Sequence, residues 1–212
     1  MIERYDWLAR LAQRVPDEAL VVSTYIGAVG FEWAALTEEH PRSAMLGQMG
    51  DVIGLALGLA LALPKRKVVC LDGDGSVLME LGQLVALGQE APANLVVFVA
   101  DNGVYESIGR GPDGPRPTAT AGRADLAAMA RACGVPHAAQ VRSMAEFERE
   151  LERAFAGPGC RFIDVRTAPG RARVPPRQVD GFEDKYRFVR YVEKLEGKQI
   201  LRLARQDRQL ME

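Results

Sequence analysis

Short apolar runs alternate with longer stretches of helical periodicity along most of the chain. Five short apolar runs, most of them with β-branched side chains, predict strands, at residues 19–24, 67–72, 94–100, 138–141 and 161–166. Apolar residues spaced three and four positions apart predict helices, at residues 51–63, 76–90, 124–133 and 143–155. Because a helical crossover joins successive strands, those strands run parallel. The pattern therefore predicts an α/β fold in three layers, with a mostly parallel central sheet and helices on both faces.

The two ends of the chain carry a different pattern. Residues 1–14 are charged and predict an amphipathic helix rather than a secretory leader. Residues 169–176 are rich in proline and arginine, which predicts an extended connector. Beyond residue 181, apolar side chains recur at helical intervals, at Phe182, Tyr186, Phe188, Val189, Val192 and Leu195. We therefore expect one α/β domain over residues 1–168, followed over residues 169–212 by a connector and a helical extension that contacts another subunit.

Oxygen-bearing side chains follow two successive predicted strands. Gly73-Asp74-Gly75 comes after the run at 67–72, and Asn102 comes after the run at 94–100. Since ligands of α/β sheets gather at the carboxyl ends of parallel strands, Asp74 and Asn102 are expected to meet at that edge. One carboxylate and one amide oxygen fill only part of the octahedral shell of Mg²⁺, which commonly takes other ligands from phosphate groups and water. These residues therefore favour Mg²⁺ bound together with a phosphorylated ligand.

Other interpretations of the same segment fit less well. A dinucleotide-binding fingerprint needs a third glycine at position 78, which is leucine. A calcium-binding EF-hand loop needs glycine at position 77, which is valine. An ordinary strand-end turn with capping acids remains an open alternative.

A second glycine-rich turn precedes the predicted helix at 51–63. It reads Met45-Leu46-Gly47-Gln48-Met49-Gly50. A turn that leads into a helix offers free backbone amides to an anion, and the helix dipole has the favourable sign. This segment is therefore a second candidate for contact with a phosphorylated ligand.

Composition restricts the class of protein further. With 212 residues and 48% hydrophobic content, the chain can bury the core of a single α/β domain. A net charge of −1 gives no electrostatic reason to expect binding to nucleic acid or to a membrane surface. Cys70, Cys133 and Cys160 are scattered, which disfavours a disulfide framework and a metal cluster. We therefore expect a protein of the reducing cytoplasm.

At these motifs the chain resembles the diphosphate-binding domain of thiamine diphosphate-dependent enzymes. The signature of that family is Gly-Asp-Gly followed, after a spacer, by Asn. The wording around Asp74 and Asn102 is most similar to the β subunits of sulfopyruvate and phosphonopyruvate decarboxylases, and the resemblance runs from residue 19 to residue 168. It implies that the side chains of Asp74 and Asn102 and the carbonyl of Val104 bind Mg²⁺, which bridges the diphosphate of thiamine diphosphate.

The resemblance also implies a wider set of cofactor contacts. Gly47 is expected to present its carbonyl to the aminopyrimidine, and Met49 to act as the wedge that keeps the cofactor bent; the alternative for Met49 is a place in the core. Tyr25-Ile26-Gly27 is expected to form the turn after the first strand. The full set of expected cofactor-binding residues is Ser23, Thr24, Gly27, Gly47, Gln48, Met49, Gly73, Asp74, Gly75, Ser76, Asn102, Val104 and Tyr105.

The substrate side of the site departs from the family pattern. Glu106 follows the expected metal loop, where relatives often have a smaller residue, and is the best candidate for a substrate contact. Gly30-Phe31-Glu32 stands where sulfopyruvate-type subunits usually have Ser-Arg-Glu, which favours a less charged substrate. Glu32 itself is expected on a solvated helix face or in a structural ion pair. The proline- and glycine-rich segment 109–120 predicts an irregular loop of the kind that forms lids.

The resemblance implies half of an active site. In this family a glutamate on a separate pyrimidine-binding domain activates the cofactor, and no part of this sequence resembles that domain. We therefore expect a non-oxidative 2-oxo acid decarboxylase subunit that acts on a small 2-oxo acid with a separate pyrimidine-binding α subunit, as an α2β2 or larger hetero-oligomer. A carboligase subunit similar to acetolactate synthase, and a cofactor-binding module without turnover, remain alternatives.

Overall fold

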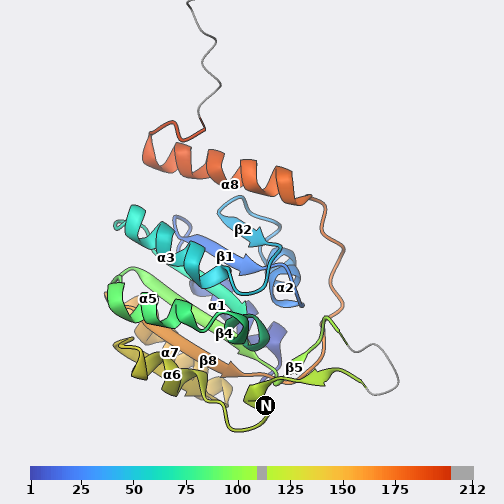
Figure 1. Cartoon of the computed structure of the whole chain (residues 1–212). Helices are drawn as coiled ribbons and strands as arrows, with labels where there is room; N and C mark the ends of the chain where they lie inside the picture. Colours follow the sequence, from blue (N-terminus) through green and yellow to red (C-terminus); the bar gives the residue numbers. More distant parts are fainter. Residues whose placement is uncertain (109–113, 202–212) are drawn as a thin grey trace, which may run out of the picture.

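A six-stranded parallel sheet forms the centre of the computed structural model, which describes residues 1–108 and 114–201 (Figure 1). Its strands are β1 (Leu20–Thr24), β2 (Ser43–Leu46), β3 (Val68–Gly73), β4 (Leu95–Asp101), β7 (His137–Val141) and β8 (Arg161–Arg166). They lie in the order β2-β1-β3-β4-β8-β7, and each neighbouring pair is parallel. The predicted fold class is therefore confirmed, and the five predicted strands are present to within two residues.

Helices cover both faces of the sheet. One face carries α1 (Arg4–Arg14), α2 (Val29–Leu36) and α7 (Met144–Ala156), and the other carries α3 (Val52–Ala62), α5 (Gly82–Glu90) and α6 (Leu126–Ala132). Strand β4 shows why the core has two halves. Val96 and Phe98 pack in the cluster on the α1 side, whereas Val97 and Val99 pack on the α3 side. Since successive side chains of a strand point to opposite faces, a continuous apolar run serves a sheet buried on both sides.

The predicted helix at 76–90 is two helices in the structure. Helix α4 (Asp74–Met79) starts at Asp74, directly after β3, and α5 starts at Gly82. The chain leaves the helical conformation at Glu80, where φ is −141° and ψ is 66°. Ser76, the first residue of the predicted helix, lies inside α4, and its hydroxyl accepts a hydrogen bond from the backbone N–H of Gly50 at 3.0 Å. This contact joins the two glycine-rich segments of the sequence.

Four short elements, one strand of the sheet and three near its carboxyl edge, were not predicted. Strand β2 forms the edge of the sheet beside β1. Strands β5 (Val104–Tyr105) and β6 (Arg116–Pro117) form a small antiparallel pair, and the 3₁₀ turn η1 (Ala119–Ala121) follows it. The prediction of an irregular loop over 109–120 is therefore wrong for its second part, while residues 109–113 lie outside the described residues. Pairing with β5 explains why two residues of a proline-rich segment are extended.

The connector and helical extension are present at the end of the described chain. Helix α8 (Gly181–Glu196) begins at Asp180, whose carboxylate accepts hydrogen bonds from the backbone N–H groups of two following residues. Phe188 and Val192 on its inner side pack against Leu20 and Ala44 of the sheet. Its predicted role in subunit contacts stays a prediction. No helix within residues 1–108 or 114–201 has the length and apolar character to cross a membrane.

Candidate functional site

A pocket lies at the carboxyl ends of β1, β3 and β4. Its walls come from residues 26–29 after β1, residues 73–76 after β3 and residues 100–107 around the end of β4, together with Arg4 and Met49. Strand order changes direction here, because the chain passes from β1 outward to β2 and then returns to β3 on the other side of β1. Such a switch point is where open α/β sheets bind ligands.

Asp74 is the buried carboxylate of this pocket. It stands at the first position of α4 and is 2% exposed. Its Oδ2 accepts hydrogen bonds from the hydroxyls of Thr118 at 2.6 Å and Thr120 at 2.8 Å. Burial raises the pKa of Asp74, the Thr118 hydroxyl opposes that rise, and the nearby carboxylate of Asp101 adds to it. A cation placed beside Asp74 would offset the cost of burying this charge.

Asn102 and Val104 share one tight turn after β4. The side-chain Oδ1 of Asn102 accepts a hydrogen bond from the backbone N–H of Val104 at 3.0 Å. Between them, Gly103 has φ of 71°, a conformation that favours glycine. The carbonyl of Gly103 accepts a hydrogen bond from the backbone N–H of Thr118 at 2.9 Å, so the β5–β6 pair holds the turn in place.

The structure brings most of the predicted cofactor residues to this pocket, but not all. Those on its walls are Gly27, Met49, Gly73, Asp74, Gly75, Ser76, Asn102, Val104 and Tyr105. Met49 is half-buried on the wall rather than enclosed in the core. Four predicted residues do not line it: Ser23, Thr24, Gly47 and Gln48. Ser23 and Thr24 are buried in β1, where the Thr24 hydroxyl accepts a hydrogen bond from the backbone N–H of Ile26, whereas Gly47 and Gln48 are exposed.

Gly75 is required by a close approach of an aromatic ring. A Cβ at this position would lie 2.5 and 2.7 Å from ring carbons of Tyr105 and 3.5 Å from the terminal methyl of Met49. Glycine therefore lets three predicted cofactor residues from three segments meet.

We expect Gly75→Ala to push the Tyr105 ring away and to lower the affinity of the assembled complex for its cofactor about tenfold, because overpacking of a tight contact costs on the order of 1–3 kcal/mol. Calorimetric titration measures this change. Gly181→Ala is the matched control, since a Cβ there meets nothing within 4 Å. Equal affinities of the two variants would contradict the assigned contact.

Sequence reasoning missed a set of side chains beneath the predicted metal ligands. The Thr120 hydroxyl lies 2.8 Å from a carboxylate oxygen of Asp74 and 2.8 Å from one of Asp101, and its single hydrogen is shared between these two acceptors. Arg166 of β8 donates to the other oxygen of Asp101. Thr118 and Thr120 stand in the segment 109–120, so proximity to Asp74 depends on the β5–β6 pairing and could not be read from spacing.

Glu106 lies on the pocket wall, but its closest contacts are within the protein. Its Oε1 accepts a hydrogen bond from the backbone N–H of Gly170 at 2.7 Å, and its Oε2 lies 3.6 Å from a guanidinium nitrogen of Arg4. Of the two settings expected for Glu32, the structure shows the ion pair and not the solvated helix face. Glu32 is 1% exposed and pairs with Arg4 at 3.0 Å.

The donor set of the pocket fits Mg²⁺ shared with a phosphorylated ligand. It offers the carboxylate of Asp74, the amide of Asn102 and the carbonyl of Val104, three hard oxygen donors of the kind that Mg²⁺ uses. Within the described residues, no group of three or more His, Cys, Asp or Glu side chains could hold a metal alone. A cation here would therefore need ligands from a bound molecule or from water.

Comparison with known proteins places this geometry in a family. Residues 25–165 match the C-terminal TPP-binding domain of thiamine pyrophosphate enzymes. The chain belongs to the thiamine pyrophosphate enzyme family. Members of this family bind thiamine diphosphate, and Mg²⁺ is the usual metal partner of its diphosphate.

Two relatives of this chain differ from each other in length. The chain is 39% identical over 178 residues to phosphonopyruvate decarboxylase of Streptomyces viridochromogenes, and the alignment covers 81% of this chain and 43% of that protein. The chain is 30% identical over 192 residues to sulfopyruvate decarboxylase subunit beta of Methanocaldococcus jannaschii, and this alignment covers 91% of the chain and 98% of that subunit. The chain is thus homologous to β subunits of decarboxylases and spans less than half the length of the phosphonopyruvate decarboxylase. Relatives named as acetolactate synthase large subunits share a smaller part of the chain.

A solved structure agrees on the fold. Thiamine diphosphate-dependent 4-hydroxybenzoylformate decarboxylase of Rhodococcus jostii superposes with a TM-score of 0.61 at 20% identity, over 80% of this chain and 33% of that one. The parallel sheet described above is therefore the thiamine diphosphate-binding fold.

Proposed function

We propose that this chain is the diphosphate-binding subunit of a thiamine diphosphate-dependent, non-oxidative 2-oxo acid decarboxylase. The observation that carries the proposal is the pocket in which Asp74, Asn102 and Val104 meet at the switch point of the sheet. Relatives named as decarboxylases, one of them a β subunit of nearly the same length, support it.

Each part of the pocket has a role in this proposal. Asp74, Asn102 and the carbonyl of Val104 would hold Mg²⁺, while Gly27 and the segment 73–76 would border the diphosphate. Met49 and Tyr105 would support the cofactor rings. When bound, thiamine diphosphate supplies the electron sink for loss of CO₂ from a 2-oxo acid. The protein contributes position, exclusion of water and the placement of charge.

A separate pyrimidine-binding α subunit completes the site in this proposal and carries the activating glutamate. The β-subunit names of relatives with matching length support a partner, and we propose an α2β2 or larger assembly. All three cysteines are free, in keeping with a cytoplasmic protein. We propose no nucleic acid or membrane partner.

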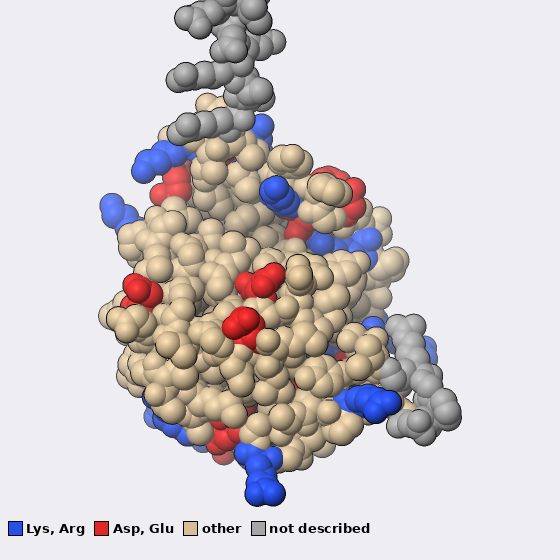
Figure 2. Space-filling view, in the orientation of Figure 1, with Lys and Arg blue, Asp and Glu red and all other residues tan. Residues whose placement is uncertain are grey.

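An apolar face beside the pocket is suited to this partner. Five apolar side chains are 37–59% exposed: Leu55 and Leu61 of α3, Met79 of α4, Leu81 just before α5, and Val85 of α5. We call these five residues the apolar face. In Figure 2 the side of the molecule that carries α3 and α5 is mostly uncharged, with acidic groups and no basic ones in its middle.

The position and charge of the apolar face favour the α subunit as its occupant. Helix α4 begins at Asp74 in the pocket and ends at Met79 on the apolar face, so a protein docked there would reach the cofactor. The charged residues of segments 51–64 and 74–93 are all acidic: Asp51, Asp74, Glu80 and Glu90. A second copy would bring like charges together, whereas a partner with a basic rim would complement them. The exposed Phe182 and Tyr186 of α8 form a further candidate surface for subunit contacts.

The decisive experiment measures products of the assembled enzyme. The chain and a pyrimidine-binding subunit, mixed with thiamine diphosphate, Mg²⁺ and a panel of 2-oxo acids, are expected to release CO₂ and an aldehyde, which neither subunit forms alone. Formation of a 2-hydroxy-2-acyl product instead would favour the carboligase alternative. Cofactor binding without any release of CO₂ would favour a module that has no turnover.

A further inference from the structure

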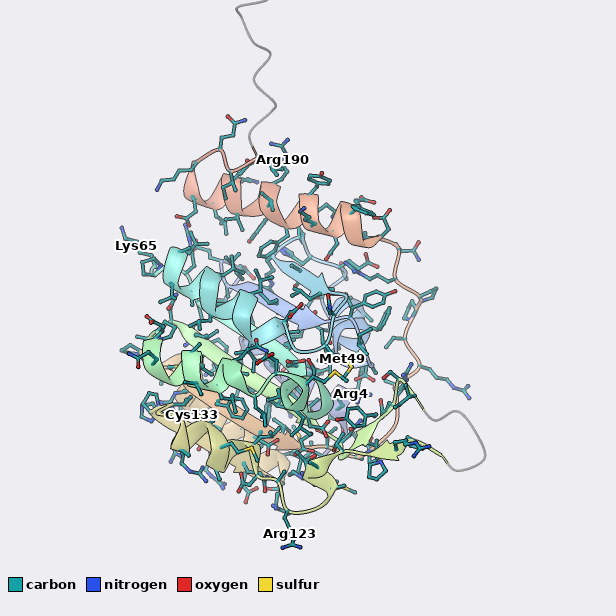
Figure 3. The ribbon with its side chains drawn as sticks, in the orientation of Figure 1. Arg4, Met49, Lys65, Arg123, Cys133 and Arg190 are labelled. Carbon is teal, nitrogen blue, oxygen red and sulfur yellow. The ribbon has the colours of Figure 1, made fainter. Side chains whose placement is uncertain are left out.

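A buried arginine connects the first helix to the pocket. Arg4 in α1 is 4% exposed and lines the same pocket as Met49; both residues are labelled in Figure 3. Its Nε donates to Oε2 of Glu32 at 3.0 Å, and its Nη2 donates to Oε1 at 3.1 Å. A guanidinium that binds both oxygens of one carboxylate has a fixed plane and a fixed direction.

The same guanidinium also contacts the wall residue Glu106. Nη1 of Arg4 lies 3.6 Å from Oε2 of Glu106, and Nη2 donates to the carbonyl of Gly170 as well. The backbone N–H of Gly170 donates to the other oxygen of Glu106 at 2.7 Å. Arg4, Glu106 and Gly170 therefore form a closed triangle of contacts, in which each member touches the other two.

Residues 168–172, directly after β8, hold this triangle from behind, and we call them the backing segment. The backbone N–H of Ala168 donates to the carbonyl of Ile2 at 2.9 Å. The backbone N–H of Ala172 donates to Oε1 of Glu32 at 3.0 Å, and the guanidinium of Arg171 donates to the carbonyl of Glu106 at 3.3 Å. Two residues far apart in the sequence, Glu32 and Glu106, thus bind the same short segment.

We propose that Arg4 is a positioning residue of the active site, which together with the backing segment behind it fixes Glu106 as a rigid wall on the substrate side of the cofactor pocket. This inference rests on the proposed decarboxylase function. The wall consists of Arg4, Glu106 and Ser107 and carries none of the predicted metal ligands. Its shape, rather than the affinity for cofactor, depends on the Arg4–Glu32–Glu106 contacts.

Burial of these charges argues for a role beyond holding the fold together. The side chains of Arg4 and Glu32 are only 3% and 1% exposed. Removal of such a charged pair from water costs free energy, whereas packed apolar side chains of similar size would carry no such cost. The pair instead gives a fixed geometry. The pair lies at a pocket wall, and a binding site needs side chains that are held in a fixed geometry.

The test uses Arg4→Lys in the assembled complex with a 2-oxo acid that the wild-type complex decarboxylates. Lysine keeps the positive charge but cannot bind Glu32, Glu106 and Gly170 together. We expect KM for the 2-oxo acid to rise about tenfold with kcat nearly unchanged, because one charge-assisted contact is lost from the wall. Hydrogen exchange at the amides of Gly170 and Ala172 is expected to accelerate, while calorimetric affinity for thiamine diphosphate stays the same. Arg10→Lys is the matched control, since Arg10 is on α1 in a surface ion pair with Glu148 and is 56% exposed.

Glu106→Gln gives an independent second variant, because glutamine keeps an acceptor for Gly170 but removes the charge opposite Arg4. The same rise in KM is expected. Faster exchange with an unchanged KM in both variants would show a purely structural role and overturn the inference. If the wild-type complex decarboxylates no 2-oxo acid, the proposed function fails and this inference fails with it; a working wild type with unaltered variants would sink the inference alone.

Discussion

Replacing Asp74 by alanine is expected to abolish the Mg²⁺-dependent binding of thiamine diphosphate by the assembled complex. Asp74 is the one carboxylate among the three proposed Mg²⁺ ligands, and Asn102 and Val104 offer only neutral oxygens. Loss of the charged ligand removes the largest electrostatic attraction for the cation. Calorimetric titration of the cofactor with and without Mg²⁺ measures the effect, and an unchanged difference between the two titrations would remove the metal role from Asp74.

Asp74→Asn separates loss of the metal from loss of the fold. Asparagine keeps an oxygen that accepts from Thr118 and Thr120 but carries no charge. Burial raises the pKa of Asp74, so in the absence of a cation the ionised carboxylate is unfavourable in the folded state. By linkage, the folded state holds that proton more tightly than the unfolded state, and stability falls as pH rises above the unfolded pKa. Without Mg²⁺ at neutral pH, Asp74→Asn is therefore expected to melt no lower than the wild type, and addition of Mg²⁺ with cofactor should stabilise only the wild type.

The parts of the fold that sequence predicted are those governed by local patterns. Short apolar runs identified five of the six strands of the sheet, and helical periodicity identified α7, which begins with the Ser143–Glu146 capping box. The meeting of Asp74 and Asn102 followed from parallel strands alone. These features need only neighbouring residues and one rule of topology, so a single sequence sufficed.

The features that were missed depend on tertiary contacts. The break between α4 and α5 places Ser76 against Gly50, a contact over 26 residues that helical spacing does not encode. Thr118 and Thr120 reach Asp74 only because β6 pairs with β5. An ion pair was one of the two settings expected for Glu32, but its partner Arg4 and its burial were missed, because they depend on the packing of α1 against α2.

The domain boundary expected at residue 168 has a different meaning in the structure. Residues 169–176 carry no helix or strand, and the backing segment, which begins at residue 168, binds Arg4, Glu32 and Glu106 directly. The connector therefore holds the wall residues Arg4 and Glu106 from behind, in addition to leading to α8. Truncation after residue 168 would remove contacts of the candidate site, not only a peripheral helix.

Val85→Lys on the apolar face is expected to weaken association with the pyrimidine-binding subunit by about 2 kcal/mol, or roughly thirtyfold in Kd, the size of effect seen when the centre of an interface is disrupted. Val85 is 59% exposed, so the folded chain accommodates lysine at this position. In the complex, the lysine would place a positive charge within the apolar face. Burial of that charge and repulsion by the basic groups proposed for the partner would both weaken association. Sedimentation or co-elution of the two subunits measures the change.

Phe182→Lys on α8 is the matched comparison, because Phe182 is also apolar and is 79% exposed. If the apolar face binds the α subunit, Val85→Lys loses both association and decarboxylation, while its melting temperature stays that of the wild type. Loss of association in Phe182→Lys with normal assembly of Val85→Lys would transfer the partner to α8. The cofactor pocket lies at one end of α4 and the apolar face at the other. Loss of association in Val85→Lys would therefore explain how a second protein bound to the apolar face reaches the cofactor.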